Sequence, residues 1–239
     1  KLVASDASTN ASFGSAVAID SDLIVVGTPN AASQTGAAYV FARDAGGANN
    51  WGQSKKIVAT DGAVQDHFGK SVAISQNRVV IGAPEDDVGA IANQGSAYVF
   101  ERHLGGTDNW GLLKKLLPAD GATFDSFGVA VDIYDDVIAI GSHFNDNGLY
   151  DTQQGAIYLF QRNAGGPDQW GQSDKMAPVG RESGDSFGFA LALQFNILVG
   201  GAPYKDMNGI SNRGAAYLFE VEATGKNQWS AGNKLITND

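Results

Sequence analysis

The feature that most constrains the fold is a phrase that the chain repeats. "FGSAVAIDSDLIVVG" begins at Phe13, and related stretches begin at Phe68, Phe127 and Phe187. Three further anchors keep the same phase: a Gly that closes an apolar run, a Tyr in a second apolar run, and a Trp. The spacings of the Trp residues are 59, 60 and 59 for Trp51, Trp110, Trp170 and Trp229. Such regularity indicates a protein built from repeated structural units.

Each unit predicts four antiparallel strands. In the first unit they are "SAVAI", "LIVVG", "GAAYVFAR" and the more polar "WGQSKKIVA", and no stretch shows helical periodicity. Glycine-rich segments before each Trp mark one hairpin tip. An Asx residue marks a tight turn between the first two strands of each unit, at Asp22, Asn77, Asp136 and Asn196. Four such units predict an all-β fold, a β-propeller of four blades with four antiparallel strands each.

We expect one domain over residues 1–239, with repeats at approximately 7–61, 62–120, 121–180 and 181–239. The two ends carry one phrase, since "KLVASD" at residues 1–6 matches both "KIVATD" at 56–61 and "KLITND" at 234–239. Both ends therefore match the same strand of the repeat, and in a closed four-bladed ring they would occupy the same position. We expect a single closed four-bladed ring. The alternative is part of a larger seven- or eight-bladed ring, or a ring completed by a second chain.

The composition excludes several classes of protein. Of 239 residues, 43% are hydrophobic, yet no apolar run approaches the length of a membrane span, so we expect no membrane insertion. The net charge of −10 argues against a nucleic-acid partner, because no basic stripe is present to pair with phosphate. The chain has no Cys, which excludes disulfides and Cys-based sites. No nucleophile, base and acid occur in a catalytic context, so we expect no enzyme and no catalytic residues.

The motifs resemble a known family. Phe-Gly is followed by Gly-Ala-Pro, intact at Gly82-Ala83-Pro84 and Gly201-Ala202-Pro203, and then by "GSAYVF" or "GAAYLF". This pattern resembles the FG-GAP repeat, which builds the β-propeller of integrin α-subunits and of many bacterial surface proteins. The resemblance implies an extracellular or cell-surface protein that binds a ligand on one face of the propeller. The motif is altered to Gly-Thr-Pro at residues 27–29 and to Gly-Ser-His at residues 141–143.

Calcium-binding members of that family carry an acidic loop between the first two strands, because hard cations need several converging oxygens. Here the same place holds only "DSD", "SQN", "YDD" and "QFN". We therefore expect no cofactor and no metal site of the family type. Weak cation binding in longer loops stays open.

The first candidate ligand site is the loop after the Gly-Ala-Pro position. The later copies hold "EDDVGAIANQ", "FNDNGLYDTQQ" and "YKDMNGISNR", where the first copy has a shorter loop. The alternative is a solvated turn, since Asp, Asn and Gly favour turns. The candidate ligand-binding residues are Glu85, Asp86, Asp87, Asn145, Asp146, Asn147, Asp151, Asp206 and Asn208.

The second candidate is the set of four Trp residues, Trp51, Trp110, Trp170 and Trp229, which could stack on sugars as a multivalent lectin. We favour a structural role, in which each Trp packs between blades.

Other polar residues recur near the Phe-Gly pairs. The acids two residues before Phe, at Asp66, Asp125 and Asp185, are expected to form hydrogen bonds in turns. His67, His103 and His143 occupy different repeat positions, which does not predict a metal site.

Together these features predict a non-enzymatic extracellular binding or adhesion module that recognises a protein or a glycan through loops on one face. Two alternatives remain. One is a structural subunit of an extracellular filament or coat, for which self-association would be the function. The other is a carbohydrate-binding lectin that uses the repeated Trp.

Overall fold

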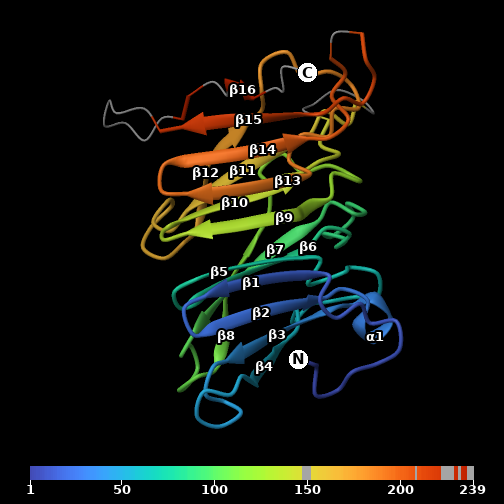
Figure 1. The fold of residues 1–239 in the computed structure, drawn as a ribbon. Helices are drawn as coiled ribbons and strands as arrows, with labels where there is room; N and C mark the ends of the chain where they lie inside the picture. The colour runs from blue at the N-terminus through green and yellow to red at the C-terminus, as the bar shows by residue number, and fades with distance from the viewer. Residues whose placement is uncertain (147–151, 208, 222–228, 231–232, 236–239) are drawn as a thin grey trace.

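The computed structural model describes residues 1–146, 152–207, 209–221, 229–230 and 233–235 (Figure 1). They form four sheets of four antiparallel strands, in which neighbours along the chain are neighbours in the sheet. The first sheet holds β1 (Ala16–Asp20), β2 (Leu23–Thr28), β3 (Ala37–Ala42) and β4 (Gly52–Ile57). The second holds β5 (Ser71–Ser75), β6 (Arg78–Ala83), β7 (Ser96–Arg102) and β8 (Trp110–Leu116).

The third sheet holds β9 (Phe127–Tyr134), β10 (Val137–Ser142), β11 (Ala156–Gln161) and β12 (Gly171–Met176). The fourth holds β13 (Ala190–Gln194), β14 (Ile197–Ala202), β15 (Ala215–Glu220) and β16 (Asn233–Leu235). A short turn, α1 (Ala31–Gln34), has left-handed backbone angles at Ala32 and Ser33, so it is not a regular helix. No helix within the described ranges is long and apolar enough to span a bilayer.

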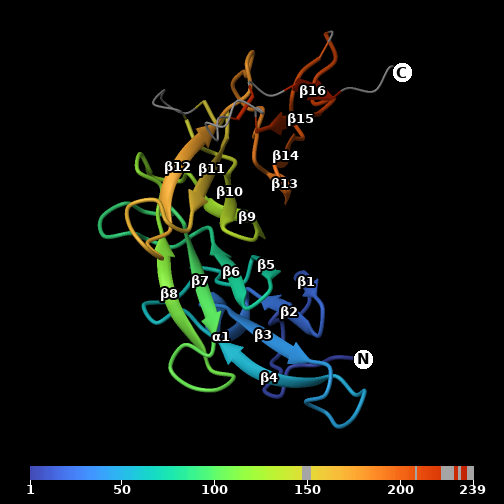
Figure 2. The ribbon, with the colours of Figure 1, turned by 90° about the vertical axis from the view of Figure 1, so that its left-hand side faces the viewer.

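The four sheets follow one another as the blades of a propeller (Figure 2). The first strands of the sheets lie inside, where β1 packs beside β5, β5 beside β9, and β9 beside β13. The predicted architecture of four antiparallel four-stranded blades is therefore confirmed. The predicted closed ring is wrong, because the blades form an arc that is open on one side (Figure 2). The same contact joins each blade to the next, and the rotation that it produces between neighbouring blades is too small for four blades to close a ring.

Each blade is held by an aromatic cluster that explains two of the sequence anchors. The Phe of each Phe-Gly packs against the Tyr and the Phe of the third strand, edge-on in every pair except the tilted Phe187 and Phe219. In the second blade the ring centroid of Phe68 lies 5.3 Å from Tyr98 and 6.1 Å from Phe100. Phe127 of the third blade repeats this with Tyr158 at 5.4 Å. The Phe and the Tyr are thus partners, which is why they recur in one phase.

Apolar side chains join each blade to the next. Val25, Val40 and Ile57 of the first blade are buried against Val72 and Ile74 of the second. The same packing joins the second blade to the third and the third to the fourth. The backbone adds a second link, because the amide of the Phe donates to a carbonyl in the loop of the preceding blade. These bonds are Phe68 to Thr35 (3.1 Å), Phe127 to Gln94 (2.9 Å) and Phe187 to Gln154 (3.0 Å).

Glycine permits a third link, in which two backbones touch. A Cβ on Gly82 would lie 2.0 Å from the carbonyl oxygen of Gly128 in the next blade. Gly27 stands in the same relation to Gly69 (2.1 Å), and Gly141 to Gly188 (2.0 Å). Real side chains do not approach a carbonyl this closely, so only glycine fits at these positions. The Gly that closes the apolar run is therefore an inter-blade contact in the first three blades.

We predict that Gly82→Ala lowers the free energy of unfolding by about 1–3 kcal/mol, because the added methyl pushes two blades apart. Gly201 is the matched control. It occupies the equivalent place in the fourth blade, where a Cβ would meet no atom closer than 3.6 Å. Urea unfolding in dilute solution measures both variants. Equal effects of Gly82→Ala and Gly201→Ala would contradict the assigned contact.

Candidate functional site

The loops after the Gly-Ala-Pro position give three successive residues three different roles. In the second blade these residues are Glu85, Asp86 and Asp87. The first points outward, the second is buried, and the third braces the loop. The corresponding residues of the third and fourth blades take the same three roles, whereas the first blade has Ala31 and Ala32 at the buried and bracing positions.

The buried position anchors the loop to its blade. Asp86 is 3% exposed, pairs with Lys115 at 2.7 Å, and accepts hydrogen bonds from Ser96 and Tyr98. Asn145, at 2% exposure, donates to Asp125 and accepts from Lys175. The fourth blade inverts the charge at this position. Lys205, at 5% exposure, pairs with Glu182 at 2.7 Å and Asp185 at 3.2 Å. Because buried charges must be paired, these residues serve the fold.

The bracing position closes the loop on itself. The Asp87 carboxylate accepts from the Asn93 amide at 2.8 Å, and Asp206 accepts from the Asn212 amide at 2.7 Å. Asp146 accepts from the amides of Thr152 and Gln153, each at 2.7 Å. Such Asx bonds explain the acidic residues of the loops as turn formers.

The outward position differs in each blade. It is Asn30 in the first blade, Glu85 in the second, Phe144 in the third and Tyr204 in the fourth, and all four are exposed. Phe144 is 37% exposed and Tyr204 is 48% exposed. A constant framework thus presents a variable side chain at this face, as recognition loops on a rigid scaffold do.

A second variable position lies three residues before the Phe of each Phe-Gly pair. It is held by Asn10, Gln65, Phe124 and Gly184. All four have positive φ, between 60° and 85°. Asn and Gly tolerate this region, whereas a bulky residue is an outlier there. Phe124 nevertheless adopts φ 66° and leaves its ring 60% exposed. The third blade is the one that places an aromatic ring at this loop position.

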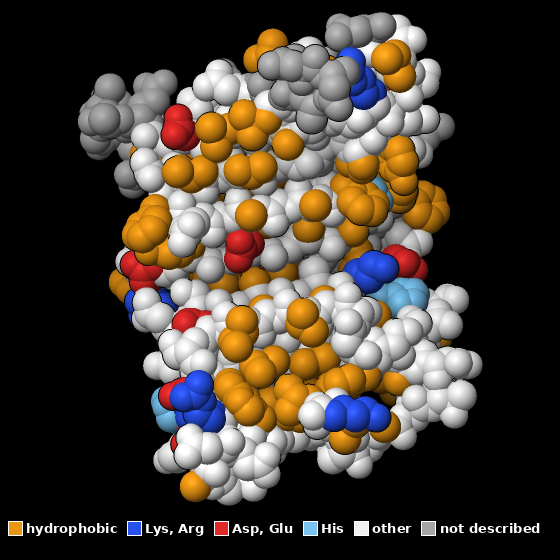
Figure 3. Space-filling view, in the orientation of Figure 1, with side chains coloured by type: hydrophobic (Ala, Val, Ile, Leu, Met, Phe, Trp, Pro, Cys, Tyr) orange, Lys and Arg blue, Asp and Glu red, His pale blue; other side chains and the backbone are white. Residues whose placement is uncertain are grey.

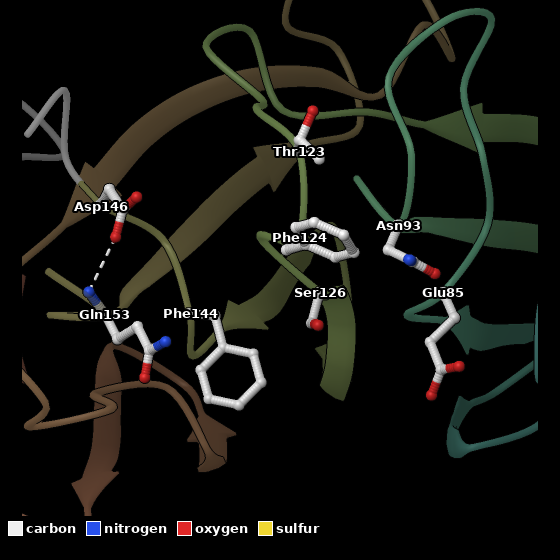
Figure 4. Close-up of a pocket in the computed structure, with 8 residues that line it drawn as sticks. All are labelled: Glu85, Asn93, Thr123, Phe124, Ser126, Phe144, Asp146 and Gln153. Atoms are coloured by element: carbon white, nitrogen blue, oxygen red, sulfur yellow. Dashed lines mark hydrogen bonds between the residues drawn. The ribbon is translucent and has the colours of Figure 1, made fainter. Parts of the chain in front are cut away.

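Phe124 and Phe144 line one pocket between the loops of the second and third blades (Figure 4). The volume of the pocket is about 540 Å³. The rest of its lining consists of two acidic residues and of Asn93, Thr123, Ser126 and Gln153. The acids are Glu85 and Asp146, which lie on opposite sides of the two rings (Figure 4). Glu85 belongs to the second blade and pairs with His67 at 3.1 Å. The pocket therefore combines apolar rings with a carboxylate on either side.

The aromatic surface continues beyond the pocket. The ring of Phe144 lies 3.8 Å from that of His143, and His143 lies 5.4 Å from Phe189. Phe189 in turn lies 6.5 Å from Tyr204 and is 45% exposed. His143 itself is buried, and burial together with the charge of Lys70 lowers its pKa to about 4. At neutral pH His143 is an uncharged part of this surface.

Of the candidate residues predicted from the sequence, Glu85 and Asp146 both line the pocket. It places Asp86 and Asn145 in the blade interior, while Asp87 and Asp206 lie in their own loops. Asn147, Asp151 and Asn208 lie outside the described residues. Phe124, Phe144, Phe189 and Tyr204 were not named. For Phe124 the available signal was an aromatic residue at a repeat position where other copies hold Asn, Gln or Gly, and for Phe144 and Tyr204 it was an aromatic residue where other copies hold Asn or Glu.

The Trp residues differ in exposure. Trp110 and Trp170 are 5% and 1% exposed, while Trp51 and Trp229 are half-buried. Trp110 packs in the core between the first two blades, and Trp170 in the core between the second and third. A sugar ring cannot reach a buried indole face, so this placement favours the structural role.

The remaining polar residues pair locally. Asp66, Asp125 and Asp185 are buried and each accepts from a backbone amide three residues earlier. His67 lies beside Glu85, His103 beside Asp108, and His143 among aromatic rings. Within the part of the chain that the structure describes, no three His, Asp or Glu residues form a group that could hold a metal ion.

A family model described as FG-GAP repeat matches residues 1–41, 51–100, 110–160 and 170–219, which is most of the chain. No curated protein matches the chain.

The buried His143 predicts a pH dependence of stability. Its folded pKa of about 4 is below the ordinary value of 6.5, so the unfolded chain binds more protons between these values. The free energy of unfolding should therefore fall as the pH drops from about 6.5 toward 4. Between pH 7 and pH 5 the wild type should lose about 1–2 kcal/mol more than His143→Phe, as measured by denaturant unfolding. Parallel pH profiles would contradict this assignment.

Proposed function

The chain belongs to the FG-GAP repeat family, and on that premise we propose that it is an extracellular, non-enzymatic recognition module that binds a protein ligand. The binding surface is the loop face over the second and third blades, with the pocket of Phe124 and Phe144 at its centre. The observation that carries the proposal is Phe124. It is an exposed aromatic residue at a position that other blades fill with Asn, Gln or Gly, and it lines a pocket together with Phe144 and two acids.

The chemistry of the pocket defines the ligand class. Two exposed phenyl rings offer apolar contact area, which is where binding energy concentrates in protein interfaces. Glu85 and Asp146 add negative charge beside the rings, and the whole chain carries a net charge of −10. We infer that the ligand presents an apolar side chain next to a lysine or arginine. Electrostatic attraction would speed the encounter, and burial of the apolar group would hold the complex.

The aromatic surface of His143, Phe189 and Tyr204 extends the pocket toward the fourth blade. A ligand that follows it would be an extended segment rather than a single small group. This favours a peptide segment of a protein over a monosaccharide. A glycan ligand would use the same rings and is an outcome that the following experiment distinguishes.

We predict that Phe124→Asn weakens ligand binding at least tenfold, because the substitution removes a central ring from the pocket. Asn is the residue that the first blade uses at this position, at φ 60°, so the variant should fold with unchanged or higher stability. The ligand is first selected from a phage-displayed peptide library and, in parallel, from a glycan array. Isothermal titration then compares the wild type with the variant.

The matched control is Phe195→Asn. Phe195 is also an exposed phenylalanine with positive φ (66% exposed, φ 53°), but it lies in the turn between β13 and β14. The control should leave the affinity unchanged. Selected peptides that bind Phe124→Asn as tightly as the wild type would overturn the proposed site. Selection of glycans alone, with affinity lost in Phe124→Asn, would keep the site and replace the protein ligand.

A further inference from the structure

A lysine, an amide and two carboxylates meet at the loop end of the third blade. The Nζ atom of Lys175 donates a hydrogen bond to Oδ1 of Asn145 at 2.9 Å and another to Oδ2 of Asp120 at 2.7 Å. The Nδ2 atom of Asn145 donates to Oδ2 of Asp125 at 2.8 Å. The amine therefore touches the amide, and each of these two groups also touches one carboxylate.

The fold brings these groups together from separate segments of the chain. Lys175 lies on the outer strand β12, opposite Tyr158 of β11, and its ammonium group lies over that ring at 5.1 Å. The inner strands β5 and β9 carry mostly hydrophobic side chains, as the face in Figure 3 shows, whereas the lysines of the second and third blades stand on the outer strands. The Tyr158 hydroxyl donates to Oδ1 of Asp120 at 2.8 Å and so holds that carboxylate beside the amine.

The two carboxylates lie in environments that shift their proton affinities in opposite directions. Burial pulls the pKa of Asp120 upward, but the hydrogen bonds from Lys175 and Tyr158 outweigh it and hold this pKa below its ordinary value. Burial raises the pKa of Asp125 above the ordinary value, against the hydrogen bonds from the Ala122 amide and Asn145. Asp120 is thus suited to act as a base beside the amine, and Asp125 to hold a proton beside the amide nitrogen.

We propose that Lys175 and Asn145 join in an intramolecular isopeptide bond. The Nζ atom gives one proton to Asp120 and attacks Cγ of Asn145, which forms the new C–N bond. The bond from Cγ to Nδ2 then breaks, as Asp125 gives a proton to Nδ2 and takes the second proton of Nζ in its place. The two protons that Nζ loses are the two that turn the leaving NH2 group into ammonium, so atoms and charge balance without any other reactant.

The surroundings favour attack by the amine over attack by water. Asn145 is 2% exposed and Asp125 is 1% exposed, whereas the side chain of Lys175 is 22% exposed. An amine held against an amide reacts as an intramolecular nucleophile, at an effective concentration that no free amine in solution reaches. The reaction occurs once in each molecule, so a small fraction of uncharged Lys175 is sufficient.

The amide distinguishes the third blade from the second, in which the same arrangement surrounds a carboxylate. There Lys115 contacts Asp86 at 2.7 Å and Asp61 at 2.6 Å. An ionised carboxylate is a poor electrophile, so this contact stays an ion pair. The first blade has Ala31 at this position and the fourth has Lys205. Among the described blades, the third is therefore the one that combines the lysine with an amide.

The link would fasten the loop that carries part of the pocket. Phe144 and Asp146 stand directly before and after Asn145, and both line the pocket. A covalent bond from this loop to β12 restricts the unfolded chain as a disulfide does, in a protein that has no Cys. The link forms without any ligand, so its test is independent of the proposed binding function.

Mass spectrometry of the 239-residue chain tests the link. We expect the wild type to have the mass of its sequence less one ammonia, and its tryptic digest to contain one peptide in which Lys175 is joined to Asn145. The joined peptide is decisive, because succinimide formation at an Asn-Gly pair also releases ammonia. A wild type without the joined peptide after prolonged incubation in the folded state would overturn the proposal.

Variants test the roles of the groups. Lys175→Arg keeps the charge but removes the nucleophile, so the joined peptide should be absent, while the matched control Lys115→Arg should retain it. Asp125→Asn keeps the shape of the side chain but removes the acid, and it should slow formation of the link by about a hundredfold or more. Circular dichroism checks that each variant is folded, and where one is not, the wild-type result decides. Formation at the wild-type rate in folded Asp125→Asn would overturn the mechanism.

The second blade allows a test by gain of function. Asp86→Asn places an amide beside Lys115, where Asp66 is buried at 3% exposure as Asp125 is in the third blade. This variant should lose a second ammonia and yield a second joined peptide that contains Lys115. A link in the third blade without one in Asp86→Asn would overturn the assignment of the reaction to the arrangement that the two blades share.

Discussion

The structure depends on one contact, in which the backbone of one blade touches the backbone of the next. The glycines at Gly27, Gly82 and Gly141 place their α-carbons where any Cβ would meet a carbonyl oxygen at 2.0–2.1 Å. A contact between backbones cannot adjust as a contact between side chains can. It therefore fixes the distance and the angle between blades, and the chain repeats that step at each junction. The apolar packing and the Phe amide bonds follow from it, because they need the blades at this spacing.

A fixed step between blades also produces the binding surface. The loop of the second blade pairs with the Phe-Gly segment of the third through backbone bonds from Phe124, Ser126 and Phe127 to residues 92–94. This pairing holds Phe124 beside Asn93 and Glu85, although thirty and more residues separate them in the sequence. Within that frame the repeat leaves two positions unconstrained, and in the third blade both are Phe. The side chains that differ between blades are thus the ones available for recognition, and the residues that the blades share hold them in place.

The sequence predicts the blades well because the pattern that defines them is local. Alternation, tight turns and the Phe and Tyr anchors all act within one unit of the chain. Closure of the ring was not predictable in this way, because it depends on the angle between blades, and that angle comes from contacts such as Gly82 with Gly128. The pocket was half predictable. Glu85 and Asp146 stood out as acids, but acids in these loops mostly brace turns, as Asp87 and Asp206 do. Phe124 carried the stronger signal, since an aromatic residue replaced Asn, Gln and Gly at a left-handed position.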